Sequence, residues 1–292
     1  MPERSSLKTV RSLDSAKVRK FGEGLNGGLI LPADGAYESA RWSWNRAVVR
    51  RPGMIVRCAN RDDIIRAVNF ARDNDLLVAV RSGGHSFAGH STCDDGMVID
   101  LSPMKEIQID SESRVARVQA GVKVGEFDRA TQAVGLATVL GGCEDVGVAG
   151  LTAGGGQGLL SGRYGLACDN LLSAEIVTAY GELMITSARQ NDDLFWGVRG
   201  GAGNFGIIAS MEFQLHRVSN VLGGMITYSI EQAKAVLRFC RDYLTDPPDE
   251  LTVVPAVVRM PEGPLVAIVA CYCGNPDVGR SCCAHFGLAV PC

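Results

Sequence analysis

The sequence lacks the features that mark a membrane or secreted protein. It has no run of about eighteen apolar residues, the length that a membrane-spanning helix needs. Residues 1–8 also lack the apolar core of a secretory signal. We therefore expect a cytoplasmic protein that has no membrane partner.

An excess of charge of one sign is also missing. The formal net charge is −3, and acidic and basic residues are interspersed rather than grouped in blocks. This distribution gives no general reason for binding nucleic acid or an anionic surface. We expect small molecules as partners, and the sequence leaves the oligomeric state open.

Cysteine is plentiful, with ten residues, but the spacing that a metal site needs is absent. The cysteines are irregularly placed through the first 240 residues, and five lie near the end, at Cys271, Cys273, Cys282, Cys283 and Cys292. These five form no paired C-x-x-C motifs, and only His285 is nearby. We predict free thiols and no metal site.

The chain has the composition of a folded protein, with 46% hydrophobic and 21% charged residues over 292 positions. From Met54 onward, β-branched runs alternate with helical periodicity, which is typical of an α/β domain. No internal repeat is present. The patterns predict helices over 60–72, 124–134 and 231–244, and strands over 54–58, 77–81, 98–101, 115–119, 174–179, 207–215, 223–230, 251–259 and 265–272.

The stretch Arg81–His90, with sequence RSGGHSFAGH, ends one of these apolar strands in a turn. Gly83 and Gly84 lack Cβ atoms, so the turn can point successive backbone N–H groups into one concavity that binds an anion. His85 stands beside that concavity. On the loop alone, His85 could equally be an ordinary surface histidine.

A second segment, residues 141–158, holds eight glycines among eighteen residues, far above the usual glycine content of about 7%. Such a backbone allows close approach by a ligand. Cys143 lies within it, where the alternative to a reactive role is a small buried side chain. Gly201–Gly206 fits the G-x-G-x-x-G dinucleotide pattern, but a strand pattern follows it, so we predict a loop rather than a Rossmann site.

Three more segments follow in order: RYGLACDN at 163–170, AEIVTA at 174–179 and DDLFWGVRGGAGNFG at 192–206. Together with the two glycine-rich segments, they resemble the FAD-binding domain of the vanillyl-alcohol-oxidase superfamily, in particular the berberine-bridge-enzyme-like oxidoreductases. The resemblance covers about residues 48–217. It implies an α/β (α+β) fold in which a PCMH-type FAD-binding domain of two mixed α/β subdomains precedes an antiparallel-sheet substrate domain. The expected domains are an N-terminal segment 1–47, the FAD-binding domain 48–217 and a partial substrate domain 218–292.

In this family the histidine of R-S-G-G-H is bonded to the flavin 8α-methyl carbon, so the resemblance implies that His85 anchors FAD covalently. Members with two covalent links bond a cysteine to flavin C6, and Cys143 falls on that position. Tyr164 is expected as a polar contact, with aromatic packing beside Gly165 as the alternative. The full set of residues expected to contact the cofactor is Arg81, Ser82, Gly83, Gly84, His85, Ser86, Gly142, Cys143, Val146, Gly147, Gly150, Gly154, Gly155, Gly158, Tyr164, Gly165, Asn170 and Ile207.

The resemblance implies an FAD-dependent oxidase that takes a hydride from an alcohol, a sugar or a related small molecule and passes electrons to oxygen or another acceptor. Family members carry their catalytic base in a later segment, so the catalytic residue is unknown here. The alternative is an FAD-binding module without turnover. If the chain is active, Tyr228 and Tyr272 are the first candidates for the base. A reductase with non-covalent FAD is a third possibility, against which His85 and Cys143 argue.

Overall fold

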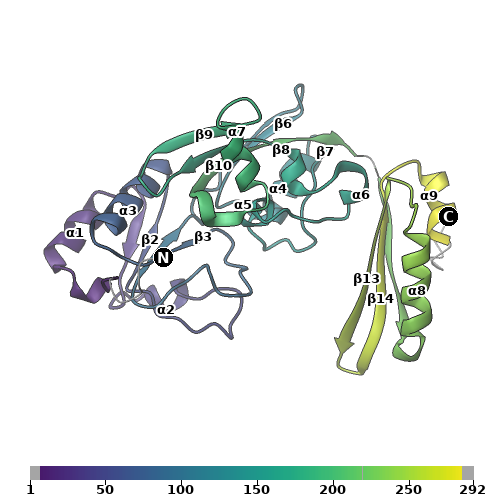
Figure 1. Ribbon diagram of the computed structural model, residues 1–292, viewed down its shortest axis with the longest axis horizontal. Helices are drawn as coiled ribbons and strands as arrows, with labels where there is room; N and C mark the ends of the chain where they lie inside the picture. Colours follow the sequence, from purple (N-terminus) through teal and green to yellow (C-terminus); the bar gives the residue numbers. More distant parts are fainter. Residues whose placement is uncertain (1–6, 219, 285–292) are drawn as a thin grey trace.

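The computed structural model describes residues 7–218 and 220–284, and they form two units (Figure 1). We call residues 7–217 the N-terminal unit and the described residues from 218 onward the C-terminal unit. The N-terminal unit contains two large sheets with helices packed around them and a small two-stranded sheet, and the C-terminal unit contains a three-stranded sheet with two α-helices.

The first sheet holds four strands in the order β1-β2-β4-β3. Its strands are β1 (Gly28–Ile30), β2 (Met54–Arg57), β3 (Val78–Arg81) and β4 (Met97–Asp100). β2, β4 and β3 are parallel, and β1 is antiparallel to β2. Helix α3 (Arg61–Asp73) links β2 to β3 and begins at Asn60, whose side chain accepts a hydrogen bond from Asp63 N. The expected strand–helix–strand succession is confirmed, although β4 lies between its two strands.

The second sheet is fully antiparallel, in the order β5-β6-β10-β8-β9. Its strands are β5 (Ile107–Asp110), β6 (Val115–Gln119), β8 (Leu171–Val177), β9 (Leu183–Ser187) and β10 (Ile207–Gln214). Helices α4 (Val124–Gln132), α5 (Val148–Ala153) and α7 (Asp192–Val198) belong to the same half of the unit. Phe127 on α4 packs against Phe213 on β10, with ring centroids 5.5 Å apart.

The remaining short elements lie at turns and at the edges of the sheets. The helices are α1 (Ser15–Glu23), α2 (Tyr37–Ala40) and α6 (Ser161–Tyr164), and the 3-10 segments are Val10–Ser12, Ala167–Asn170, Ala202–Phe205 and Ile230–Gln232. The 3-10 turn at Ala202–Phe205 leads directly into strand β10. The prediction that the G-x-G-x-x-G match is a loop rather than a Rossmann turn is therefore confirmed.

One hydrophobic core joins the two sheets of the N-terminal unit. Met54 and Ile99 from the first sheet and Val118 and Met211 from the second all belong to the same buried cluster. The two subdomains are thus packed together as one body.

The C-terminal unit is a three-stranded antiparallel sheet in the order β12-β14-β13. Its elements are β12 (Leu222–Ser229), α8 (Ala233–Tyr243), β13 (Leu251–Met260), β14 (Gly263–Tyr272) and α9 (Pro276–Ala284). Cys240 of α8 packs with Leu251, Ile268 and Tyr272 on one face of the sheet. The strands and α8 were predicted, whereas α9 was not. His285 and Cys292 lie outside the described residues.

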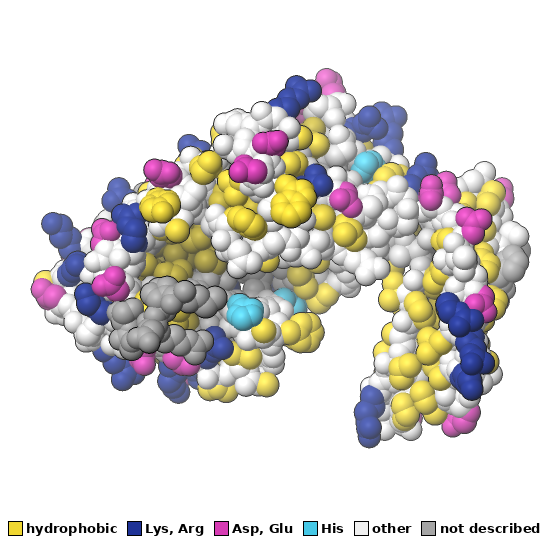
Figure 2. Space-filling view, viewed as in Figure 1, with side chains coloured by type: hydrophobic (Ala, Val, Ile, Leu, Met, Phe, Trp, Pro, Cys, Tyr) yellow, Lys and Arg dark blue, Asp and Glu magenta, His cyan; other side chains and the backbone are white. Residues whose placement is uncertain are grey.

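The open face of this sheet is apolar and lies toward the N-terminal unit (Figures 1 and 2). Met225 and Val254 on this face are 65% and 38% exposed, and both stand opposite Val269 in the register. Figure 2 shows hydrophobic side chains along this side of the unit and a hollow between the two units.

The two units meet at a narrow junction. Strand β11 (His216–Arg217) pairs with β7 (Leu136–Ala137) before the chain leaves for β12. Gly162 N donates a hydrogen bond to Thr252 Oγ1 over 3.1 Å, which ties α6 to β13. None of the helices within residues 7–218 and 220–284 is long and apolar enough to cross a membrane.

Candidate functional site

The two glycine-rich segments that the sequence singles out touch each other. A Cβ atom on Gly83 would collide with Gly147 N, and one on Gly147 would collide with Ser82 Oγ. No side chain larger than hydrogen fits at either position without moving the backbone. The loop after β3 and the loop before α5 are therefore held in direct backbone contact.

The loop after β3 has the geometry expected of an anion-binding turn. Gly84 is buried and takes a φ of +72°, a conformation that glycine adopts without steric cost. Within the described part of the chain, the N–H groups of Gly83, Gly84 and His85 donate no hydrogen bond. Successive backbone N–H groups without a protein acceptor can bind an anion, so these free donors fit a ligand with negatively charged oxygens, such as the diphosphate of FAD.

The flanking serines are turned toward the protein. Ser82 Oγ donates to Ala120 O over 2.5 Å, and Ser86 Oγ accepts from His90 N over 3.0 Å. These bonds fix both ends of the turn. The serine hydroxyls thus hold the loop in shape, while the backbone amides between them remain available.

His85 is half-buried, and the Trp44 ring lies against its imidazole, with centroids 4.9 Å apart and planes 22° from parallel. Burial lowers the pKa of His85, the Asp145 carboxylate raises it, and the Lys123 ammonium lowers it. Lys123 Nζ and Asp145 Oδ1 form an ion pair at 2.8 Å, so the charges on either side of His85 partly cancel. The imidazole is therefore held in its neutral form near pH 7, and this is the form in which a ring nitrogen is nucleophilic.

Cys143 lies on the other loop with an exposed thiol. Its carbonyl oxygen accepts a hydrogen bond from Val146 N over 3.3 Å, which closes the turn leading to Gly147. Asp145, two residues further along, is the carboxylate that acts on His85. The segment that carries Cys143 is thus adjacent to the His85 loop, and a bond from its sulfur to a flavin stays a prediction.

Arg81, which was expected to contact the cofactor, has its side chain buried in the protein. Its guanidinium pairs with the buried Asp100 at 3.0 Å and donates to Ala40 O over 2.7 Å. This arrangement ties the ends of β3 and β4 to the segment 40–42. Arg81 therefore anchors the start of the His85 loop to the first sheet. The R-S-G-G-H motif is local in sequence, so it did not predict Asp100 as the partner of Arg81.

Tyr164 and Asn170 belong to a cluster that also contains His216, which sequence reasoning missed. Asn170 Nδ2 donates to the carbonyl oxygens of Tyr164 and Leu166, both at 2.8 Å, and Asn170 Oδ1 lies 2.6 Å from His216 Nε2. The Tyr164 ring stacks on His216, with centroids 4.0 Å apart. The packing alternative for Tyr164 is thus observed, and the Asn170 side chain is occupied by protein groups.

The pKa of His216 is lowered by burial and by the neighbouring Arg114 and Arg163 guanidinium groups. A neutral imidazole can stack on Tyr164 and donate to Asn170 without bringing a third positive charge into this cluster. His216 is the first residue of β11, so its contact with Tyr164 and Asn170 lies where the chain passes from the N-terminal unit to the C-terminal unit.

The other expected contact residues lie along the second loop and beside it. Gly155 O and Gly156 O accept hydrogen bonds from Cys168 N and Ala167 N, which joins the second loop to the segment 163–170. Ile207 begins β10 opposite Val177. The others among them are Gly142, Val146, Gly150, Gly154, Gly158 and Gly165; Gly150 lies within α5, and the rest lie on the segments that flank α5 or directly after α6.

Tyr228 and Tyr272 lie on the wrong side of the C-terminal sheet to serve as a base. Both pack into the cluster beneath α8, and burial raises the pKa of Tyr272. Thr252, which contacts the N-terminal unit, points to the opposite face, since it lies next to Leu251 in the strand and Leu251 pairs with Tyr272. The phenol groups thus face the helix and not the unit that carries His85.

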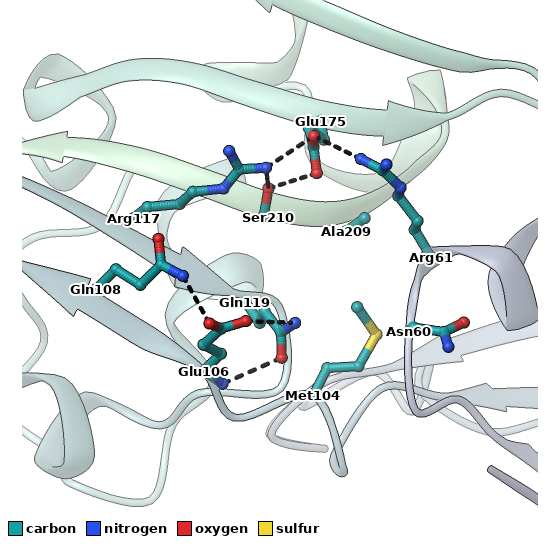
Figure 3. Close-up of a pocket in the computed structure, with 10 residues that line it drawn as sticks. All are labelled: Asn60, Arg61, Met104, Glu106, Gln108, Arg117, Gln119, Glu175, Ala209 and Ser210. Carbon is teal, nitrogen blue, oxygen red and sulfur yellow. Dashed lines mark hydrogen bonds and ion pairs between the residues drawn. The ribbon is translucent and has the colours of Figure 1, made fainter. Parts of the chain in front are cut away.

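A separate polar cavity of about 310 Å³ lies between the start of α3 and the second sheet (Figure 3). Glu175 binds Arg61 at 3.1 Å, Arg117 at 2.8 Å and the Ser210 hydroxyl at 2.8 Å. Burial opposes ionisation of Glu175, but these hydrogen bonds and charges together lower its pKa. Arg61, Arg117 and Glu175 thus satisfy one another across the boundary of the two subdomains, and Glu106 accepts hydrogen bonds from Gln108 and Gln119.

Comparison with known proteins agrees with the geometry of the two loops. Residues 52–187 match the model of an FAD binding domain. The chain is 35% identical over 262 residues to (R)-6-hydroxynicotine oxidase of Paenarthrobacter nicotinovorans, and 35% identical over 279 residues to an FAD-linked oxidoreductase of Dictyostelium discoideum. The chain thus carries an FAD-binding domain, and its relatives are FAD-linked oxidoreductases of the vanillyl-alcohol-oxidase superfamily.

Solved structures similar to this chain include a nicotine oxidase and berberine-bridge-enzyme-like proteins. A crystal structure of 6-hydroxy-D-nicotine oxidase from Arthrobacter nicotinovorans superimposes with a TM-score of 0.84 at 35% identity, covering 89% of this chain and 58% of that one. The berberine-bridge-enzyme-like protein 1 of Physcomitrella patens superimposes with a TM-score of 0.86 at 25% identity, covering 94% and 60%. The mixed α/β PCMH-type fold is thereby confirmed.

The match covers only part of each relative. The chain aligns over 88% of its own length with the nicotine oxidase but spans 57% of that protein, and the corresponding shares for the Dictyostelium protein are 94% and 60%. The resemblance in sequence and fold therefore concerns about three fifths of the relatives.

Proposed function

We propose that this chain holds FAD through His85 and serves an oxidase that takes a hydride from an alcohol, a sugar or a related small molecule. The observation that carries the proposal is the backbone contact between Gly83 and Gly147 beside a neutral, half-buried imidazole. FAD, when bound, supplies the acceptor for the hydride. Dioxygen or another acceptor would then take the electrons.

Different residues would bind different parts of FAD. The free N–H groups of Gly83, Gly84 and His85 would hold the diphosphate. The glycine-rich segment from Gly147 to Gly158 would lie along the cofactor, because its glycines let the backbone approach closely. Cys143 would form a second bond to the flavin ring, so FAD would be held by two covalent links, one to His85 and one to Cys143.

Oxidase relatives support oxygen as the acceptor, since the similar proteins include (R)-6-hydroxynicotine oxidase. Another similar structure, 29% identical, is that of a grass pollen allergen with glucose dehydrogenase activity. These two names span an amine-bearing ring and a sugar, so they leave the substrate of this chain open. The cytoplasmic location expected from the sequence stays a prediction.

The second candidate function is an FAD-binding module without turnover. Glu144 is ion-paired with Arg129 and Asp145 with Lys123, both at 2.8 Å, so neither carboxylate is free to take a substrate proton. The Tyr164 ring is stacked on His216. These contacts engage the three groups with protein partners, which supports a chain that binds the cofactor without turnover, since hydride abstraction needs a base within reach of the substrate proton.

The experiment that tests the proposal is acid precipitation of the full chain after purification with FAD. Flavin that stays yellow and fluorescent in the washed pellet is covalently bound. We expect such flavin in the wild type, less in Cys143→Ala or His85→Ala, and none in the double variant. His90→Ala, an exposed histidine five residues further along, is the control and should behave as wild type.

A wild-type chain that binds FAD but never retains it in acid would refute the covalent link and leave the binding proposal standing. A chain that binds no FAD at all would refute both. Turnover of simple alcohols or sugars by this chain at about 1–1000 per second would exclude the module without turnover.

A further inference from the structure

A segment far from the motif covers the His85 loop. Trp44 N donates to Gly84 O over 3.1 Å, and Asn45 Nδ2 donates to Phe87 O over 2.8 Å. The Phe87 ring meets the Trp44 ring edge to face, with centroids 5.2 Å apart. Three contacts thus fasten residues 44 and 45 to the loop on both sides of His85.

The stack of Trp44 on His85 fixes a ring that the loop alone leaves free to rotate. An imidazole on a turn has a broad preference about its second side-chain torsion, and a nearly parallel indole at 4.9 Å restricts it to one plane. The stack covers one face of the imidazole and leaves the ring nitrogens at its edge. The Lys123–Asp145 pair is the charged neighbour that also acts on His85.

Trp44 contributes little to the core, which makes a purely structural role a poor explanation for its place. Its side chain is 51% exposed and belongs to none of the buried hydrophobic clusters within the described ranges. The Trp44 ring is half exposed and stacks on the proposed nucleophile, so its main effect should be on His85 rather than on the stability of the core.

We propose that Trp44 is a positioning residue for covalent attachment of the flavin: its indole sets the plane of His85 so that a ring nitrogen faces the flavin 8α-methyl carbon. This inference rests on the proposed function, because it requires the histidyl bond. Trp44 touches His85 and not the reacting carbon, and its effect is on the rate at which the bond forms.

The bond that Trp44 assists has a complete chemical balance. The C–H bond of the 8α-methyl group would break first, its proton leaving to water and its electron pair entering the flavin ring. The neutral His85 nitrogen would then form the C–N bond with its lone pair, and the imidazole would lose its own proton. Dioxygen would take the two electrons from the reduced ring and, with the two protons released, become hydrogen peroxide. Orientation of a nucleophile can change such a rate by orders of magnitude.

The test starts from the full chain expressed under riboflavin limitation, to which FAD is added. Acid-stable flavin is measured against time, and reversible FAD binding is measured from the quenching of flavin fluorescence before the bond forms. We expect Trp44→Leu to slow bond formation by about tenfold or more and to leave reversible affinity within about threefold. Trp44→Phe should restore most of the rate, since it keeps a flat ring. Trp196→Leu, at an exposed tryptophan on α7, is the matched control and should match the wild type.

The pH dependence of the rate gives a second readout that loss of stability would not move. Removing the indole exposes His85 to water, so the midpoint of the rate against pH should rise in Trp44→Leu. Equal rates in wild type and Trp44→Leu would overturn the proposal, and so would loss of reversible FAD binding in both Trp44 variants, which would assign a structural role. If the wild type itself forms no acid-stable flavin, the proposed covalent link is wrong, and the positioning role of Trp44 is refuted with it.

Discussion

The two units of the chain are stabilised in different ways. In the N-terminal unit one buried cluster reaches across both sheets and includes side chains from α3, α4 and α5. In the C-terminal unit the buried cluster has four members, and one face of the sheet carries the exposed Met225 and Val254. Burial of apolar area is the main stabilising contribution in folding. We therefore expect the C-terminal unit to unfold first, at a lower temperature or denaturant concentration.

The difference places the proposed cofactor chemistry in the more stable unit. His85, Cys143 and the free amide groups all lie on loops anchored to the two sheets of the N-terminal unit. The C-terminal unit offers an apolar face toward that unit without sharing its core. Loss of structure in the C-terminal unit should therefore leave FAD binding in place, and three substitutions test this separation.

The largest effect is expected for Arg81→Met. The change leaves the Asp100 carboxyl group buried, 4% exposed and without its main partner, which costs about 3–5 kcal/mol in the free energy of unfolding. The second unfolding transition should move strongly and the first should stay. Arg57→Met is the matched control, because Arg57 also faces Asp100 but is half exposed and 3.9 Å away, so we expect at most about 1 kcal/mol. Equal effects of the two substitutions, measured by denaturant unfolding, would contradict the buried-pair argument.

The next effect is expected for Ile268→Ala in the C-terminal unit. Ile268 is fully buried beneath α8, and its truncation should cost about 2–5 kcal/mol. Only the first unfolding transition should move, and the amount of acid-stable flavin should match the wild type. Val269→Ala, on the open face of the same strand, is the control with a much smaller expected cost. A single transition that shifts as a whole in Ile268→Ala would show that the units unfold together.

The smallest effect concerns acid pH at the junction. The folded-state pKa of His216 is lowered below its unfolded value of about 6.5. The unfolded chain therefore binds more protons as the pH falls through this value, so stability decreases below about pH 6.5. His216→Gln should reduce this loss, measured as the difference between unfolding midpoints on the two sides of that pH. If this difference is unchanged in His216→Gln, His216 does not contribute to the loss of stability at acid pH. The pKa of His85 is also lowered, so His85→Gln is the comparison that tells the contribution of the junction from that of the His85 loop.

Much of the fold follows from local pattern. Strands with buried β-branched residues, such as Met54–Arg57, and helices with a clear cap, such as the one begun by Asn60, were predicted within a few residues. Strands β5 and β9 were missed because their side chains are mostly half-buried or exposed, which leaves a weak hydrophobic signal. The insertion of β4 between β2 and β3 was also missed, because strand order depends on long-range packing that no local pattern carries.

For the candidate site, too, local motifs predicted some features and long-range contacts could not be predicted. Motifs identified both glycine-rich loops, and the structure brings them into contact through Gly83 and Gly147. Contacts between residues distant in the sequence were not predictable: Trp44 lies 41 positions before His85, and His216 lies 46 positions after Asn170. Asp100 gave no signal as the partner of Arg81. Motifs therefore locate the loops, whereas the side chains that orient them come from elsewhere in the chain.

The route by which the chain leaves the N-terminal unit also determines how that unit bears mechanical load. The C-terminal unit is attached through β11 to β10, and β10 is hydrogen-bonded on both sides, to β6 and to β8. Because antiparallel hydrogen bonds lie perpendicular to the strands, tension along β10 loads its two ladders in shear, with many bonds strained together. A machine that pulls on the chain from its later residues would first unravel the β12–β14–β13 sheet and would then stall at β10. The loops that carry His85 and Cys143 are thus shielded from tension that enters through the C-terminal unit.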